Sequence, residues 1–66
     1  MSDDGPILEG QLWASTRSGD HRTVTVIIGP DPEFEPRRVL VAGRRTYSIL
    51  ESTLRDRYRL IKDAPR

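Results

Sequence analysis

The residues best suited to covalent chemistry are Ser18, Asp20 and His21, a hydroxyl, a carboxylate and the only imidazole of the chain. Nucleophilic catalysis needs such a trio to converge around a substrate, with one group activating another. Here all three lie in one short stretch of turn-forming residues, where neighbouring side chains have little room to close on one another or to form a pocket. We therefore expect a non-enzymatic protein with His21 exposed to solvent.

A second set of side chains, Asp31, Glu33 and Glu35, alternates along a proline-rich stretch. Carboxylate oxygens suit hard cations, but calcium takes about six to eight oxygen ligands, more than this stretch offers. The segment 43–46 is equally unsuited to a nucleotide, because it lacks the spacing and the lysine of a phosphate-binding loop. The sequence predicts an acidic solvated loop and no bound cofactor or metal.

Clusters of arginine are candidates for anion binding, because the guanidinium group presents a planar fork of donors that matches phosphate. Arginines are paired at 37–38 and 44–45 and alternate at 55, 57 and 59, where they share one face if that stretch is a strand. One expectation is therefore a nucleic-acid site formed by Arg44, Arg45, Arg55, Arg57 and Arg59. Stacking aromatics would have to come from Trp13, Phe34, Tyr47 and Tyr58, most of which the core needs.

Recognition of another protein is the function that we favour from the sequence. Phe34 stands alone on a loop, with Glu33 and Glu35 beside it and prolines at 30, 32 and 36 that stiffen the backbone. A rigid aromatic side chain loses little conformational entropy on binding, so it makes a good anchor. We expect this site to comprise Trp13, Glu33, Phe34 and Glu35. In the competing interpretation, Phe34 folds back over an open end of the core.

Length and composition limit the architecture that holds these residues. The chain has 66 residues, 35% of them hydrophobic, and no cysteine. Ordering the chain costs on the order of 100 kcal/mol, so nearly all apolar side chains must serve one core without help from a disulfide. We expect one small domain and not a two-domain enzyme. With no long apolar run and no basic N-terminus typical of a signal peptide, we also expect a cytoplasmic protein that does not enter membranes.

The formal net charge of +1 conceals a division along the chain. Residues 1–36 contain seven acidic and two basic side chains, and residues 37–66 contain three acidic and nine basic ones. Such a division can mark a surface for nucleic acid or for an acidic partner. In a small sheet protein, however, strands from the two halves lie side by side. We favour a mixed solvated surface.

Strand signals dominate the first two thirds of the chain. The clearest strand is 22–28, where β-branched residues abound and Val24, Val26 and Ile28 share one face. Prolines exclude a regular element between 29 and 36. The remaining strands of the expected antiparallel meander are 10–15, 38–42 and a segment that begins at 45 or 46 after a turn.

Residues 47–61 fit two different structures. On a helix, one face collects Tyr47, Leu50, Leu54, Tyr58 and Ile61, which predicts a helix over 48–62 after a β-hairpin or meander. On strands, Ile49 and Leu60 also find inward positions, and 51–55 fits one helical turn with Leu54 pointing inward. We favour strand, turn and strand, and keep the long helix as the alternative.

The order of these elements resembles an SH3-like small β-barrel. More narrowly, the chain is similar to small proteins of actinobacteria and their phages in the patterns Gly10-x-Leu12-Trp13, Arg22-Thr23-Val24-x-Val26, Arg45-x-Tyr47-x-Ile49 and Leu54-x-x-Arg57-Tyr58-x-Leu60-Ile61. The resemblance implies a mainly β, five-stranded barrel with one short helical turn near 51–55, and a phage origin. It transfers no site residue, because SH3-like barrels host many unrelated binding roles.

These observations predict a flexible N-terminus over 1–9, a single domain over 10–62 and a tail over 63–66. The expected function is a small protein-interaction module that acts on a host or phage protein, and nucleic-acid binding is the alternative. Because a small sheet leaves unpaired backbone groups at its edges, a homodimer formed through edge strands is a further option.

Overall fold

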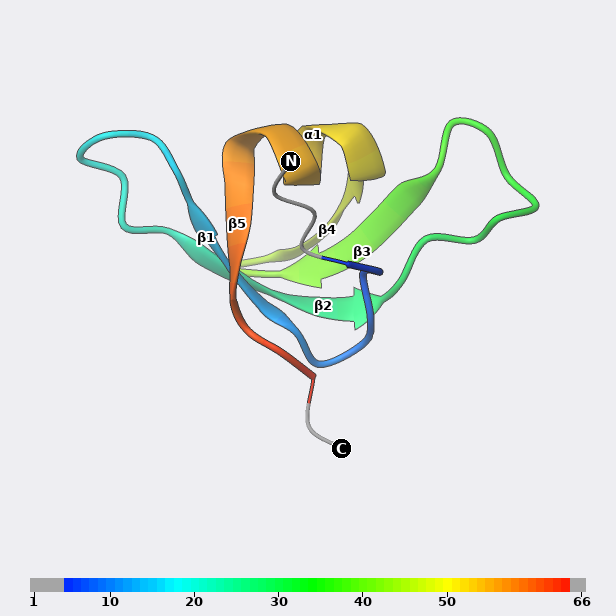
Figure 1. Ribbon diagram of the computed structural model, residues 1–66, viewed down its shortest axis with the longest axis horizontal. Coiled ribbons are helices and arrows are strands. Elements are labelled where there is room, and N and C mark those ends of the chain that lie inside the picture. Colours follow the sequence, from blue (N-terminus) through cyan, green and yellow to red (C-terminus); the bar gives the residue numbers. More distant parts are fainter. Residues whose placement is uncertain (1–4, 65–66) are drawn as a thin grey trace.

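The computed structural model describes residues 5–64, which form five strands and one helix (Figure 1). In chain order the elements are β1 (Leu12–Ser15), β2 (Thr23–Ile28), β3 (Arg38–Ala42), β4 (Thr46–Leu50), α1 (Glu51–Arg57) and β5 (Tyr58–Lys62). The prediction of a mainly β protein with one short helix is confirmed. Residues 1–4 and 65–66, which include parts of the predicted flexible terminus and tail, lie outside the described residues.

The alternative prediction, a helix over 48–62, is wrong. The backbone is extended at Leu50 and again at Tyr58, with ψ angles of 139° and 160°, so α1 is confined to the seven residues between them. The physical reason is that Leu60 lies opposite Trp13 in the sheet, where it covers the core as a strand residue. A continuous helix would turn Leu60 away from the face that carries Leu54.

The strands form one antiparallel sheet in the order β4-β3-β2-β1-β5. The sheet is strongly bent, but within residues 5–64 no pairing joins β4 to β5, so the closed barrel that the sequence predicts is not observed. Successive strands reverse direction. The β1–β2 loop and the β3–β4 turn therefore lie at one end of the sheet, and the β2–β3 loop lies at the other (Figure 1).

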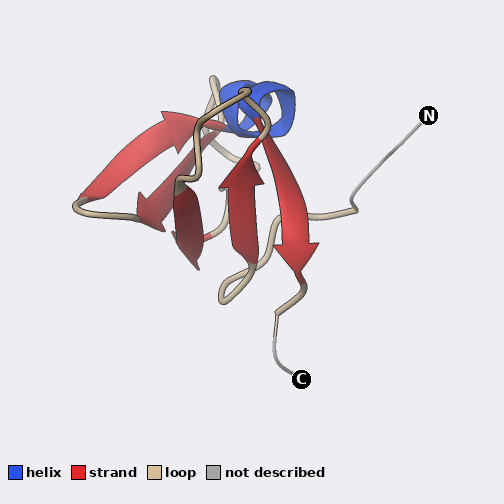
Figure 2. Cartoon of the chain, turned by 90° about the vertical axis from the view of Figure 1, so that its left-hand side faces the viewer, coloured by secondary structure: helices blue, strands red, loops and turns tan. Residues whose placement is uncertain are grey.

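The core occupies the inner face of the bent sheet. Directly opposite residues of an antiparallel pair share a face, and the register places Trp13 opposite Val24 and Val41 opposite Tyr47. The buried apolar side chains are Ile7, Trp13, Val24, Val26, Val39, Val41 and Leu54. Leu54 is the only buried residue of α1, which lies at one end of the sheet in Figure 2. Its position confirms the predicted inward turn.

The N-terminal segment contributes more than the sequence predicts. Ile7, in the stretch expected to be flexible, is only 4% exposed and belongs to the core. The segment is held by the buried side chain of Gln11, which donates to the Pro6 carbonyl and accepts from the Leu8 amide, each at 3.0 Å. The packed part of the chain therefore begins before residue 10. No helix in the described range is long and apolar enough to cross a membrane.

Candidate functional site: a basic groove at one end of the sheet

The predicted protein-binding residues are divided between core and surface. Trp13 is 0% exposed, so the expectation that it contributes to a binding surface is corrected. The physical reason is its place in β1, an interior strand between β2 and β5, where its ring faces the inner side of the sheet. The indole is the largest fully buried side chain of the described residues, and it fills the core of a chain too short to spare it.

Phe34 lies on the surface, on the loop of residues 29–37 between β2 and β3, which we call the Phe34 loop. Its side chain is 66% exposed, so it does not fold back over the core. Two hydrogen bonds order this loop: the amide of Glu33 donates to the Asp31 carboxylate at 2.9 Å, and the amide of Phe34 donates to the Asp31 carbonyl at 3.2 Å. Glu35 is paired with Arg37 at 3.5 Å.

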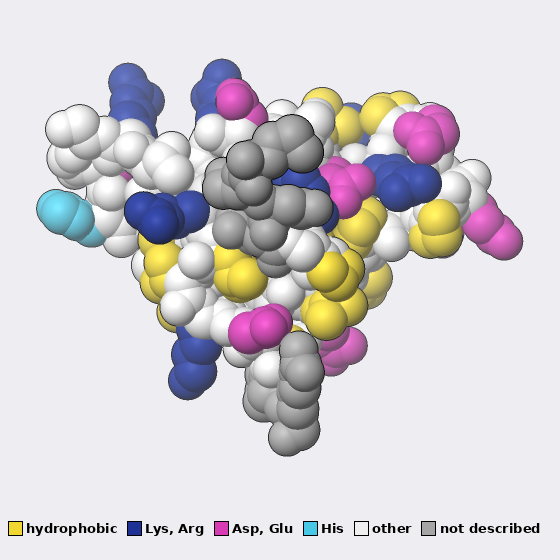
Figure 3. Space-filling model, in the orientation of Figure 1, with side chains coloured by type: hydrophobic (Ala, Val, Ile, Leu, Met, Phe, Trp, Pro, Cys, Tyr) yellow, Lys and Arg dark blue, Asp and Glu magenta, His cyan; other side chains and the backbone are white. Residues whose placement is uncertain are grey.

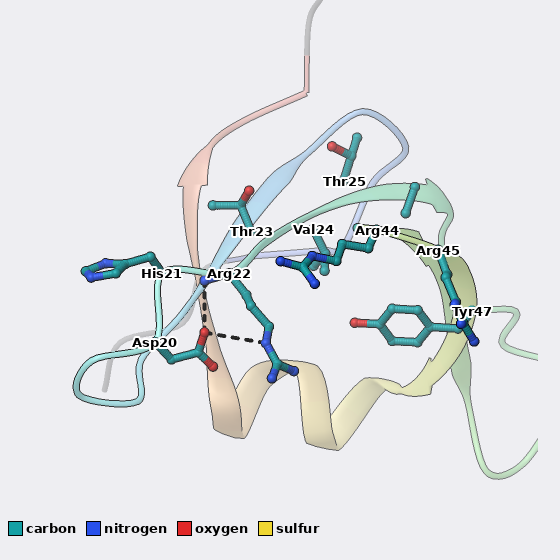
Figure 4. Close-up of a pocket in the computed structure, with 11 residues that line it drawn as sticks. Asp20, His21, Arg22, Thr23, Val24, Thr25, Arg44, Arg45 and Tyr47 are labelled. Carbon is teal, nitrogen blue, oxygen red and sulfur yellow. Dashed lines mark hydrogen bonds and ion pairs between the residues drawn. The ribbon is translucent and has the colours of Figure 1, made fainter.

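A groove lined by cationic side chains lies at the opposite end, where the β1–β2 loop faces the β3–β4 turn. We call it the basic groove. Its residues are Asp20, His21, Arg22, Thr23, Val24, Thr25, Ala42, Gly43, Arg44, Arg45 and Tyr47. Figure 4 shows Arg44 extending across the opening toward Arg22, with the hydroxyl of Tyr47 pointing into the same space and His21 pointing away.

The backbone explains why these side chains meet. β2 and β3 pair at Thr25 and Ala42, and the chain turns immediately after Ala42. Gly43 lies against β2, and a Cβ there would be in ordinary contact with a methyl of Val24, at 3.4 Å. The two arginines that follow Gly43 are therefore held beside the start of β2, where Arg22 precedes Thr23. Tyr47, which lies on β4 opposite Val41 of β3, supplies the aromatic ring.

Of the five arginines predicted as one nucleic-acid site, only two line this groove. Arg44 and Arg45 line the groove, but Arg55 lies on α1, where it donates to the Gly5 carbonyl at 2.8 Å and pairs with Glu51 at 3.4 Å. Arg57 ends the helix, and Arg59 lies on β5 opposite Ala14. The condition under which residues 55, 57 and 59 would share one strand face is not met, because only the last of them is on a strand.

Arg22 was missed by sequence reasoning. It belongs to the acidic half of the chain, so the division of charge pointed away from it. The available signal was topological: in an antiparallel meander, the loop after the first strand and the turn after the third lie at the same end. Arg22 starts the second strand and Arg44 follows the third, so the predicted strands already placed them close together.

The only carboxylate that lines the basic groove is already engaged. Asp20 accepts the Arg22 amide at 2.9 Å, and its side chain lies 3.6 Å from the Arg22 guanidinium. The amide hydrogen bond from Arg22, followed by a side-chain hydrogen bond from Ser15 and the charges of Arg22 and Arg17, outweighs the effect of burial and lowers the pKa of Asp20 below 3.8. The carboxylate is thus ionised at neutral pH and partly offsets Arg22, while Arg44 and Arg45 keep the groove cationic.

The pKa of Tyr47 is raised above 10.0, first by burial and then by a side-chain hydrogen bond with Tyr58. The phenol is therefore neutral across the physiological range, and it offers a ring face and a hydroxyl but no negative charge. Within residues 5–64, no three acidic, histidine or cysteine side chains gather closely enough to hold a metal ion. The chemistry that this groove offers is the binding of an anion beside an aromatic ring.

Comparisons of the chain with protein-family models, with curated proteins and with solved structures find no match.

Proposed function

We propose that this protein is a small non-enzymatic binding module whose basic groove holds single-stranded nucleic acid. The observation that carries the proposal is the convergence of Arg22, Arg44 and the Tyr47 hydroxyl on one opening (Figure 4). Arginine grips phosphate through charge-assisted hydrogen bonds, and an aromatic ring stacks on bases of any identity. The groove supplies three arginines and one partly exposed tyrosine, the two kinds of side chain that such a site uses.

The shape of the molecule favours a single strand over a duplex. Readers of duplex DNA commonly insert a helix or a β-ribbon into the major groove. Here the only helix of the described residues has seven residues and buries Leu54 in the core, so it is not free to enter a groove. Stacking on Tyr47 requires a base that is already out of a helix, as in a single strand or a loop.

The resemblance to SH3-like barrels remains part of the proposal. A meander of four strands, a short helix and a last strand that pairs with the first is the arrangement that this resemblance implies. Such small folds present their loops at the ends of the sheet, which is where the basic groove lies. Fold alone does not define a ligand, so the ligand class is argued from the groove.

A second candidate function is recognition of a host or phage protein through the Phe34 loop. The observation in its favour is that Phe34 is 66% exposed on a loop that prolines and hydrogen bonds hold in place. This version of the site contains Glu33, Phe34 and Glu35 and omits Trp13, which is buried. Replacing Phe34 with Ala is expected to abolish partner capture without lowering stability, and unchanged capture would refute it.

Titration of labelled single-stranded DNA, single-stranded RNA and duplex DNA tests the nucleic-acid proposal. We expect single strands to bind best. The affinity should fall between about 50 and 200 mM salt, with a log–log slope of roughly −2 if three phosphates are contacted. Tyr47→Leu, which keeps an apolar side chain over the core, should weaken binding at every salt concentration without changing the slope.

Two double variants with equal loss of charge make the test specific to the groove. Arg44→Gln/Arg45→Gln removes two groove cations, and Arg38→Gln/Lys62→Gln removes two cations that do not line the groove. We expect the first to abolish binding and the second to retain most of it. Equal weakening by both, or binding that does not respond to salt, would overturn the proposed site.

A further inference from the structure

The two ends of the molecule carry opposite charge. The basic groove presents Arg22, Arg44 and Arg45, whereas the Phe34 loop presents Asp31, Glu33 and Glu35 and a single cation, Arg37, which pairs with Glu35 at 3.5 Å. In Figure 3 basic groups and the histidine gather at the end of the β1–β2 loop, and acidic groups with a basic group between them lie at the end of the β2–β3 loop. This division in space does not follow the division along the chain, because Arg22 of the acidic half lies in the basic groove and Arg37 of the basic half lies in the Phe34 loop.

The Phe34 loop has the features of a ligand for such a groove. Phe34 is the most exposed large apolar side chain of the described residues, at 66%, and carboxylates flank it. The Asp31 side chain is oriented by the Glu33 amide, at 2.9 Å, so the loop is ordered before it binds. Binding a preordered loop costs little conformational entropy.

The loop cannot reach the groove of its own chain. The β1–β2 loop and the β2–β3 loop lie at opposite ends of the longest axis, along which the molecule extends 35 Å (Figure 1). The only copy of this loop that can meet the groove belongs to a second molecule. The aromatic ring and carboxylates of the loop can therefore contact the arginines of a groove only when the two belong to different molecules.

We propose that the chain associates with itself head to tail, the Phe34 loop of one molecule docking in the basic groove of the next. Phe34 packs against the Tyr47 ring and the flat face of an arginine, and the flanking carboxylates pair with Arg44 and Arg45. Because the two contacting surfaces differ, each pair leaves one loop and one groove free, and association can continue into short chains of molecules.

Self-association uses the groove that we assign to nucleic acid but does not require that assignment. If both ligands use it, they compete, and a short oligonucleotide should disperse the associated protein. The contact is small and mostly electrostatic, so it should be weak and should weaken further as salt rises.

Sedimentation velocity over a wide range of protein concentration provides the test. Three variants are needed: Phe34→Ser removes the anchor, Arg44→Glu/Arg45→Glu reverses the groove, and Ile61→Ser removes another exposed apolar side chain, 52% exposed, on the edge strand β5. Circular dichroism establishes that each variant is folded. We expect association of the wild-type protein and of Ile61→Ser, and weakening by about tenfold or more in the other two.

Mixing the two defective proteins tests whether the loop of one molecule docks in the groove of another, and growth of the wild-type protein beyond a dimer distinguishes head-to-tail docking from a closed symmetric dimer. Phe34→Ser keeps a working groove, and Arg44→Glu/Arg45→Glu keeps a working loop. An equimolar mixture should therefore form a dimer that does not grow, although each protein alone is monomeric. A monomeric wild-type protein, a mixture that stays monomeric, or association lost in Ile61→Ser instead would overturn the inference. At protein concentrations at which the wild-type protein is monomeric, oligonucleotide binding by Phe34→Ser should be unchanged, so failure of this inference and failure of the proposed function are separable.

Discussion

The indole N–H of Trp13 donates a hydrogen bond of 3.1 Å to the side-chain oxygen of Gln11, two residues earlier in the chain, and both side chains are at most 1% exposed. The same oxygen accepts the Leu8 amide, and the side-chain nitrogen donates to Pro6 and to the Asp63 carboxylate at 3.1 Å. One buried amide therefore joins the N-terminal segment, the central tryptophan and the residue after β5. A buried polar group of this kind stabilises the fold only if all its partners are present.

Gln11→Leu should lower the free energy of unfolding by about 2–4 kcal/mol, because it leaves the Trp13 and Leu8 N–H groups without acceptors in a buried site. For a chain of this size that is a large fraction of a total stability of roughly 3–10 kcal/mol. In Gln11→Leu/Trp13→Phe the indole donor is absent as well, so the double variant should lose less than the sum of the single losses. Urea unfolding followed by circular dichroism measures all three. Strictly additive losses would show that the hydrogen bond does not couple the two residues.

Helix α1 depends on a single buried side chain. Leu54→Ala should cost about 2–5 kcal/mol and leave the protein partly unfolded at room temperature. Leu54→Met keeps the volume and should cost less than about 1.5 kcal/mol. Ser52→Ala, on the exposed side of the same helix, should change stability by no more than about 0.5 kcal/mol. Thermal unfolding of the three variants tests this ranking, and a tolerated Leu54→Ala would show that α1 is not packed on the core.

Much of this fold follows from local patterns in the sequence. The strand at 38–42 and the strand at 58–62 have the predicted bounds, because alternation of Val39 and Val41, and of Tyr58 and Leu60, distinguishes an inner from an outer face. The helix also appears where the turn was predicted, although it extends two residues further, to Arg57. These features depend on neighbours close in the chain, and sequence patterns report such neighbours well.

The features that the sequence did not reveal depend on contacts between distant residues. The burial of Ile7 requires Gln11 as a hydrogen-bonding partner, and the role of Gln11 in turn requires Asp63, which is 52 residues away in the chain. No periodic pattern marks such a residue. The basic groove likewise joins Arg22 to Arg44 across a sheet, and its arginines come from opposite halves of the chain. Only the topology brings them together.

Alkaline pH should weaken the fold through Tyr47. Its pKa is raised above 10.0 by burial and by the hydrogen bond with Tyr58, so folding favours the neutral phenol. The resulting stabilisation is fully present below the pKa that Tyr47 has in the unfolded chain. It is lost as pH rises through the higher pKa that Tyr47 has in the folded protein. Tyr47→Phe should therefore flatten the decline in stability above about pH 10. In Tyr58→Phe, the ultraviolet absorbance of tyrosinate should show Tyr47 ionising at lower pH than in the wild-type protein. An unchanged midpoint would exclude the hydrogen bond as a cause.

Two glycines offer a matched test of how the N-terminal segment packs. A Cβ at Gly29 would lie 2.9 Å from the Ile7 carbonyl oxygen, closer than the backbone tolerates, whereas a Cβ at Gly43 would meet Val24 and Thr23 at 3.4 and 3.5 Å, ordinary contact distances. Gly29→Ala should therefore displace the segment that carries Ile7, with a loss of about 1–3 kcal/mol. Gly43→Ala should be close to neutral in stability.

Hydrogen exchange at the Leu8 amide, which donates to the Gln11 side chain at 3.0 Å, should accelerate in Gly29→Ala and stay unchanged in Gly43→Ala. Equal protection of that amide in both variants would mean that the contact between Gly29 and Ile7 does not hold the segment in place.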